Sequence, residues 1–260
     1  MENYSPELQT FLNLLEKKTE MTAMLAPSFP IVFSYPEIIG KLKKLGFAQT
    51  AEVARGAVET NNQLLKLIKN NPNKRYITSP CPSIVRLIRH KYPSLKQFLA
   101  ENYSPMVNTA KIIKQKYPNS KPVFIGPCPI KKLEAKQDFP QLGIIVLTYK
   151  ELSKVFALKN IQKDSSDSTA SFDIIGPPAR LYPVSGGLAQ SSNLNNLLTD
   201  EEFDVISGFK LAEQSLKEFP NNRLKVLDIL YCDGGCIAGL GIDSQLTTTQ
   251  RREKIISFWD

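Results

Sequence analysis

A chain of 260 residues is long enough to bury one large hydrophobic core or two smaller lobes. Hydrophobic residues make up 42% of the chain and charged residues 22%, which excludes a wholly disordered or fibrous protein. The 33 Lys and Arg residues outnumber the 25 Asp and Glu residues, for a formal charge of +8. The single histidine excludes a His-rich metal site, so any soft-metal site has to be built on the four cysteines.

Helical and extended hydrophobic patterns alternate along the chain. The spacing predicts helices over residues 7–18, 35–45, 61–69, 83–90, 95–102, 104–115, 150–158 and 209–219, with another starting near residue 131. It predicts strands over residues 50–53, 75–78, 122–125, 143–147, 203–206 and 226–230, a β-rich stretch over residues 25–33, and a polar loop over residues 162–171. Strands that alternate with helices favour an α/β fold with largely parallel sheets.

The chain opens without a basic and apolar leader, and its longest strongly apolar run, residues 143–147, is far too short to cross a bilayer. We therefore expect a cytoplasmic protein with no membrane partner. The basic residues are spread along helices, often as pairs such as Lys43 and Lys44, with no aromatic-interleaved patch. This distribution is typical of solvated helix faces and predicts no nucleic-acid partner.

The four cysteines each follow a predicted strand. Cys81 lies in the run TSPCP, Cys128 in GPCP, and Cys232 and Cys236 in YCDGGC. Because the carboxyl ends of parallel strands are where ligands collect, we expect the four thiols to meet. The i, i+4 spacing of the last two predicts one helical turn that carries both thiols on one face. The two glycines between them let backbone pass close to an inorganic group.

Spacing alone leaves three interpretations of these cysteines open. An iron–sulfur site with four cysteine ligands comes first, because the ligands are far apart in sequence and two of them precede proline. Four unrelated buried cysteines come second. Structural zinc comes third, because its sites usually pair two short knuckle motifs.

The order of these segments resembles a known family. The runs TSPCP, SPM, GPCPIKKLE and CDGGCIAGLG are similar to the signature segments of the [FeFe]-hydrogenase large subunit, C-terminal domain, over roughly residues 22–258. The resemblance implies two lobes of mostly parallel β-sheet flanked by helices, with a cluster clamped between them. It also implies a helical lead-in over residues 1–21 and one family domain of two intertwined lobes over residues 22–260.

The resemblance further implies a ligand set for one [4Fe–4S] cluster: Cys81, Cys128, Cys232 and Cys236. Lys131 takes the place of a lysine that faces the cofactor. Pro80 stands where the family has a proton-transfer thiol, and Gly126 stands where it has methionine. Because proline carries no titratable proton, we expect no catalytic residue, no efficient hydrogen turnover and no secure di-iron subsite.

These observations predict an iron–sulfur protein that acts in electron transfer or in redox or hydrogen sensing. One alternative is an active [FeFe]-hydrogenase that oxidises hydrogen or reduces protons at a di-iron subsite. Another is an iron–sulfur assembly or scaffold protein like the Narf-like relatives. Since the chain contains no ferredoxin module, we expect a ferredoxin-like or flavodoxin-like electron carrier, or a signalling protein, as its partner.

Overall fold

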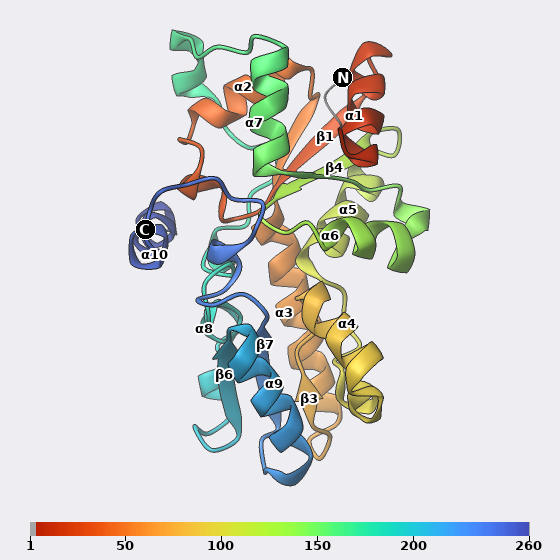
Figure 1. Cartoon of the computed structure of the whole chain (residues 1–260), viewed down its shortest axis with the longest axis vertical. Helices are drawn as coiled ribbons and strands as arrows, with labels where there is room; N and C mark the ends of the chain where they lie inside the picture. Colours follow the sequence, from red (N-terminus) through yellow and green to blue (C-terminus); the bar gives the residue numbers. More distant parts are fainter. Residues whose placement is uncertain (1–3, 260) are drawn as a thin grey trace.

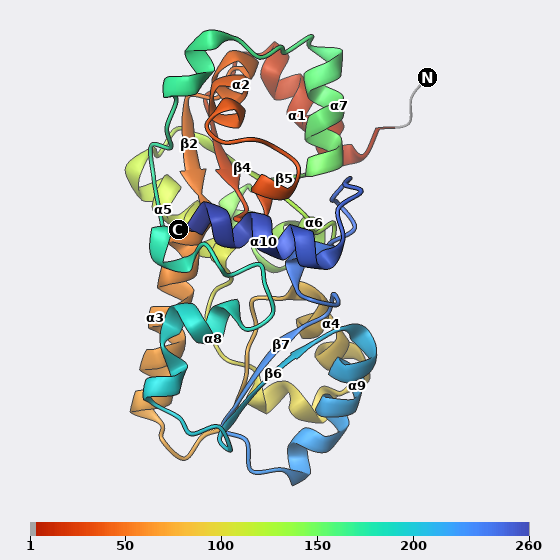
Figure 2. The same cartoon turned by 90° about the vertical axis from the view of Figure 1, so that its left-hand side faces the viewer.

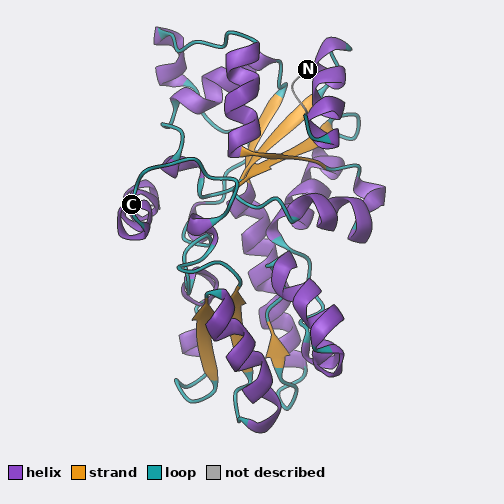
Figure 3. Ribbon diagram, in the orientation of Figure 1, coloured by secondary structure: helices purple, strands orange, loops and turns teal. Residues whose placement is uncertain are grey.

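The chain folds into two lobes, each built on its own parallel β-sheet (Figures 1 and 3). The computed structural model describes residues 4–259. The upper lobe of Figure 1 contains the sheet β2-β1-β4-β5, and the lower lobe contains the sheet β3-β7-β6. The strands are β1 (Met21–Leu25), β2 (Gln49–Glu52), β3 (Tyr76–Ile77), β4 (Lys121–Gly126), β5 (Ile145–Thr148), β6 (Phe203–Ser207) and β7 (Val226–Leu230). All paired strands in both sheets run parallel, as the alternating pattern predicts.

Helices cover both sheets and connect successive strands. They are α1 (Pro6–Glu16), α2 (Glu37–Leu45), α3 (Val53–Asn70), α4 (Pro82–Lys91), α5 (Pro105–Lys116), α6 (Lys131–Leu133), α7 (Tyr149–Leu158), α8 (Gly187–Ser192), α9 (Phe209–Glu218) and α10 (Thr248–Trp259). A π turn over Glu134–Asp138 continues α6. Helix α1 belongs to the upper lobe, because Leu8 and Phe11 lie in its hydrophobic core. Among residues 4–259, the structure contains no helix long and apolar enough to cross a membrane.

Local sequence explains where several helices begin and end. The Ser5 hydroxyl accepts a hydrogen bond from the Leu8 N–H and caps α1. Thr148 and Glu151 form a capping box at the start of α7. Helix α2 ends at Gly46, whose φ of 109° lies in the left-handed region that glycine adopts without strain.

The predicted β-rich stretch over residues 25–33 is wrong beyond its first residue. Strand β1 ends at Leu25, and Phe29–Ile31 forms a 3-10 turn. Pro27 and Pro30 have no N–H to donate to a strand ladder, so the chain leaves the sheet here.

Two predicted helices also differ from the structure. Residues 95–102 do not form an α-helix, because the helical hydrogen bonding there is a 3-10 segment over Pro93–Phe98. The predicted helix over residues 61–69 is only the second half of α3. Its first half is rich in small residues, Ala54, Gly56 and Ala57, which hide the apolar pattern although they are buried. The other predicted strands and helices match closely.

Helix α3 joins the two lobes. It begins directly after β2, with Val53 in the upper core, and carries Ala57 and Leu64 into the lower core. Figure 2 shows it running down from the junction, with α10 lying across the junction. The ring of Phe258 on α10 packs edge-on against Phe29, with ring centroids 5.0 Å apart.

The two sheets point their carboxyl ends toward each other. The arrows of the upper sheet run down to the junction and those of the lower sheet run up to it (Figure 3). The loops that follow β3, β4 and β7 therefore all leave their sheets at the junction, where they meet between the lobes. This arrangement places the cysteine-bearing loops of both lobes in one region.

Close packing of α3 against α5 yields a stability prediction. A Cβ atom at Gly56 would overlap the Pro105 carbonyl oxygen and the Thr109 side chain. Gly56→Ala should therefore lower the free energy of unfolding by about 1–3 kcal/mol, although alanine is the better helix former. Asn62→Ala on the exposed face of α3 is the control and should change it by less than about 0.5 kcal/mol. Urea unfolding measures both, and a Gly56→Ala protein as stable as the wild type contradicts the packing argument.

Candidate metal centre

The structure brings the four cysteines together at the junction of the lobes. Each is a half-buried free thiol. Cys81 precedes α4, Cys128 lies in the turn after β4, and Cys232 and Cys236 follow β7. Each of the six pairs of cysteines interacts electrostatically, which places the four sulfur atoms in one cluster. The upper lobe supplies one thiol and the lower lobe supplies three.

The surroundings of these thiols oppose their ionisation. Burial, and then the proximity of Cys81 and Cys128, raises the pKa of Cys232 to about 12. Burial and the three other thiols raise the pKa of Cys236 well above its ordinary value. Burial and Cys81 also raise the pKa of Cys128, although Lys131 and the backbone N–H groups of residues 130 and 131 act against the rise. Four thiolates gathered in this way need a positive centre, and a bound metal supplies one.

The loop that carries the last two cysteines is not the predicted helical turn. Residues 232–235 form a tight turn in which Gly234 and Gly235 have φ values of 79° and 104°. Gly235 forms a bridge with Val184, and a Cβ atom there would lie 2.5 Å from the Pro183 carbonyl oxygen. Cys236 then begins a 3-10 turn. The spacing of the two cysteines is therefore set by two positive-φ glycines, which helical periodicity does not describe.

The same loop reaches across to the upper lobe. The Gly241 N–H donates to the Pro127 carbonyl oxygen at 2.7 Å, and the Lys150 N–H donates to the Gly241 carbonyl oxygen at 3.1 Å. Pro127 directly precedes Cys128. Backbone hydrogen bonds therefore connect the loop of Cys236 to the turn of Cys128 and to the start of α7 across the junction.

The donor set consists of four cysteine thiols. Within residues 4–259, no three side chains of His, Cys, Asp or Glu are arranged to hold one metal ion. A tetrahedral zinc site draws its thiolates to within about 2.3 Å of one atom. An iron–sulfur cubane instead spaces its four cysteine ligands around a larger inorganic body. Four interacting cysteine thiols fit an iron–sulfur cluster, whose ligands are cysteine thiolates.

Lys131 is buried beside these thiols. Its ammonium group donates to Glu134 Oε2 at 2.6 Å and to the Pro80 carbonyl oxygen at 3.1 Å. Its charge acts on both Cys128 and Cys236. The structure therefore places Lys131 against the cysteine cluster and fixes it to the backbone next to Cys81. His90 lies exposed in the last turn of α4, away from this centre.

A small apolar cavity of about 70 Å³ adjoins the cysteines, and Pro80, Cys128, Lys131 and Cys236 are among its lining residues. It is about half the volume of a cavity that admits benzene. The ring of Phe124 also lines it and lies over Gly126, where a Cβ atom would come within 2.5 Å of the ring. The absence of a side chain at Gly126 thus leaves room for this ring.

A buried tyrosine and aspartate behind the cysteines were missed by sequence reasoning. Burial, Asp228 and Cys236 raise the pKa of Tyr182. The Tyr182 hydroxyl and Asp228 Oδ2 have no hydrogen-bond partner among the described residues. Asp228 Oδ1 accepts a hydrogen bond from the Thr78 hydroxyl at 3.4 Å. The one sequence signal was an acid in the otherwise apolar strand VLDIL.

The chain is similar in sequence to known proteins. The family model described as "Iron only hydrogenase large subunit, C-terminal domain" matches residues 19–240. The NADP-reducing hydrogenase subunit HndD of Solidesulfovibrio fructosivorans is 23% identical over 244 residues. The match covers 75% of this chain. The chain spans 42% of the length of that relative.

Solved structures share the fold. A variant of an [FeFe]-hydrogenase from Chlamydomonas reinhardtii superposes with a TM-score of 0.72 at 17% identity, covering 96% of this chain and 88% of that one. A variant of its apo form gives a TM-score of 0.71 at 16% identity, with the same coverage. At these identities the similarity shows the fold alone, and it confirms the predicted two-lobed α/β architecture.

The buried carboxyl of Asp228 yields a pH prediction. Burial raises its pKa to about 6, against hydrogen bonds from the Ala189 N–H and the Thr78 hydroxyl. A raised carboxyl pKa adds stability that is fully present below about pH 3.8 and is lost as pH rises through about 6. Asp228→Asn, which stays neutral, should therefore gain up to roughly 3 kcal/mol over the wild type between pH 4 and pH 7.5.

Urea unfolding across this pH range measures the difference. Asp204→Asn, an exposed position on the neighbouring strand β6, is the matched control and should show no such trend. A difference between Asp228→Asn and the wild type that stays constant with pH would show that the carboxyl is already ionised in the folded protein.

Proposed function

Since this chain belongs to the family of the iron-only hydrogenase large subunit, C-terminal domain, we propose that it is an iron–sulfur protein that holds one [4Fe–4S] cluster through its four cysteines. We propose that it acts in electron transfer or in redox or hydrogen sensing. The observation that carries the proposal is the mutual interaction of four half-buried thiols from both lobes. When bound, such a cluster supplies one-electron chemistry at the junction.

The chain's own residues would then adjust the reduction potential of that cluster. Lys131 brings a positive charge to Cys128 and Cys236 and is held in place by Glu134 and the Pro80 carbonyl oxygen. A nearby cation favours the more negative, reduced state of a cluster. The half-buried cysteines and the interlobe hydrogen bonds would keep the cluster largely out of water.

Residues around the cysteines support a role without hydrogen turnover. Pro80 places a carbonyl oxygen next to the cavity, where it accepts from Lys131, and its side chain has no proton to transfer. Phe124 lies over the position at which the family carries methionine. Loss of a general acid or base typically costs about 10²–10⁴-fold in rate. We propose a redox carrier or a signalling protein as the partner.

The alternative that a specific observation favours is an active [FeFe]-hydrogenase. The cavity beside Cys128 and Cys236 is lined by Lys131, and the relatives are named as hydrogenases. A di-iron subsite would occupy that cavity and bring catalytic hydrogen chemistry. Infrared bands of carbonyl and cyanide ligands after maturation would favour this alternative, and their absence would reject it.

Iron content tests the main proposal. Protein purified without oxygen should be brown and contain about four irons per chain. Cys128→Ala should lose the iron and the colour, because the chain has four cysteines in total and none to spare. Ser257→Ala on the exposed face of α10 is the control and should keep both. A colourless wild type with zinc as its only metal would overturn the proposal.

The charge of Lys131 tests the site from a second direction. Lys131→Gln should lower the midpoint potential of the cluster, because the reduced state loses its nearby cation. The matched control is Lys132→Gln, because Lys132 pairs with Glu151 at 2.6 Å, away from the thiols. Redox titration followed by electron paramagnetic resonance measures both. Equal shifts in the two variants would show that Lys131 has no special place at the cluster.

A further inference from the structure

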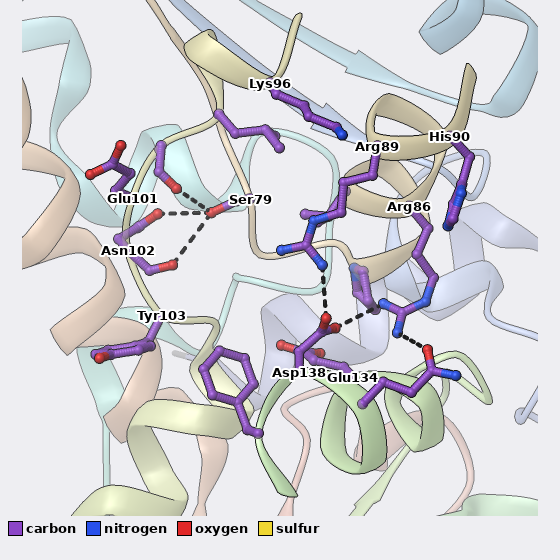
Figure 4. Close-up of a pocket in the computed structure, with 16 residues that line it drawn as sticks. Ser79, Arg86, Arg89, His90, Lys96, Glu101, Asn102, Tyr103, Glu134 and Asp138 are labelled. Atoms are coloured by element: carbon purple, nitrogen blue, oxygen red, sulfur yellow. Dashed lines mark hydrogen bonds and ion pairs between the residues drawn. The ribbon is translucent and has the colours of Figure 1, made fainter. Parts of the chain in front are cut away.

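A large cleft opens between the lobes on the side of α4 (Figure 4). Its volume is about 930 Å³, within the range of sites for small molecules. The lower lobe contributes α4 and the segment of residues 96–103, and the upper lobe contributes the π turn Glu134–Asp138 and Phe139. It is separate from the apolar cavity beside the cysteines, since the lining residues of the two differ.

The wall of the cleft formed by α4 and Lys96 carries more basic groups than the acids of the opposite wall pair. Arg86 and Arg89 both donate to Asp138, at 3.0 and 2.7 Å, so one carboxylate serves two guanidinium groups. Arg86 also donates to Gln137 at 2.9 Å. Within residues 4–259 the Lys96 amine has no hydrogen bond or ion pair, and Arg89 has no partner besides Asp138. Each guanidinium has five N–H donors, so this wall retains free donors.

The other two acids that line the cleft, Glu134 and Glu101, do not neutralise the positive charge of this wall. Glu134 is paired with Lys131. Glu101 lies across the cleft with its carboxylate turned away from the arginines (Figure 4). Unpaired guanidinium and ammonium donors facing a cleft are suited to carboxylate or phosphate groups.

Two aromatic rings also line the cleft. The rings of Tyr103 and Phe139 pack edge to face with centroids 5.8 Å apart, and Tyr103 is exposed. An apolar or planar body can lie against such a surface while its charged end reaches the basic wall. The cleft thus combines the two features of a site for an amphipathic small molecule.

Both walls of the cleft follow directly in sequence from segments that carry a cysteine. Helix α4 begins directly after Cys81, and it carries Arg86 and Arg89 about one and two turns later. On the other wall, Cys128 is followed by Lys131, Glu134 and the π turn that ends at Asp138. Single π turns occur frequently at functional sites. A molecule held between these walls would contact the two segments that position two of the cysteines.

We propose that this cleft binds a small organic anion. Its carboxylate or phosphate group is held by Arg89 and Lys96, and its apolar body lies against Tyr103. The proposal is independent of the cluster, because every residue in it lies outside the cysteine set. The partner is identified by chemistry alone: an anionic end and an apolar end, of a size that the cleft accepts.

Calorimetric titration of the full-length protein with three probes tests the proposal: AMP, citrate and inorganic pyrophosphate. At least one probe should bind saturably, with one site per chain, below about 10 mM. Arg89→Gln and Lys96→Gln should each weaken that binding by about tenfold, because each removes a charged donor. Arg252→Gln, an exposed arginine of α10, is the matched control and should bind as the wild type does.

The three probes also test the role of Tyr103 and show whether the site prefers a phosphate or a carboxylate. Tyr103→Ala should weaken AMP, which has a ring, and leave pyrophosphate unchanged. Tighter binding of AMP or pyrophosphate assigns a phosphate, and tighter binding of citrate assigns a carboxylate. Circular dichroism shows whether each variant is folded, and both basic residues tested lie at the surface. The proposal is overturned if no probe binds saturably, or if Arg252→Gln weakens binding as much as Arg89→Gln does.

Discussion

The gathering of four thiols between two lobes is the constraint on which the rest of the structure depends. Three of the thiols come from the lower lobe and one from the upper, so the site exists only when both lobes are folded and docked. Burial raises the pKa values of Cys128, Cys232 and Cys236, which means that the protein alone does not favour their charged form. A metal cluster would offset that cost and would hold the lobes together at the same time.

The lobes are nevertheless connected by protein contacts of several kinds. Helix α3 runs through both cores, and the Gly241–Pro127 hydrogen bond joins the loops of two cysteines. Farther out, Arg180 pairs with the buried Glu52 at 2.6 Å and lies over the ring of Phe258 on α10. These contacts position the cysteine loops within the fold itself. The ring of Phe124 over Gly126, and the Lys131 ammonium on the Pro80 carbonyl, then shape the space beside the thiols.

The same loops that carry the cysteines also form the interlobe cleft. Helix α4 extends from Cys81 and the π turn extends from the Cys128 segment, and their charged side chains meet at Asp138. An iron–sulfur centre and a binding cleft that share two supporting segments would suit a protein that relates a redox state to a small molecule. The cleft and the cysteine site are connected through the chain itself, because α4 follows Cys81 and the π turn follows the segment of Cys128.

The sequence by itself determined the α/β class, most element positions and the expectation that the cysteines meet. Alternating apolar patterns predicted the strands, and the rule that ligands collect at the carboxyl ends of parallel strands predicted that the four cysteines meet. Cys81 and Cys128 follow strands of different sheets, so the meeting of these two sheet edges is a result of the tertiary structure. Sequence reasoning failed at the cysteine loop, where the outcome depends on residues distant in the chain. The i, i+4 spacing predicted a helical turn over Cys232 and Cys236, whereas two positive-φ glycines form a tight turn, in which Gly235 packs against Pro183 and Val184.

Tertiary structure alone decided the side-chain neighbours of the site. The buried Tyr182 beside Asp228 and the two arginines on Asp138 each join segments separated by many residues. No local pattern encodes such contacts, because they arise only when segments distant in the chain pack together. Local hydrogen bonding and the periodicity of hydrophobic residues are properties of short segments, so they can be predicted from the sequence. The charge and space around a site are properties of the assembled chain.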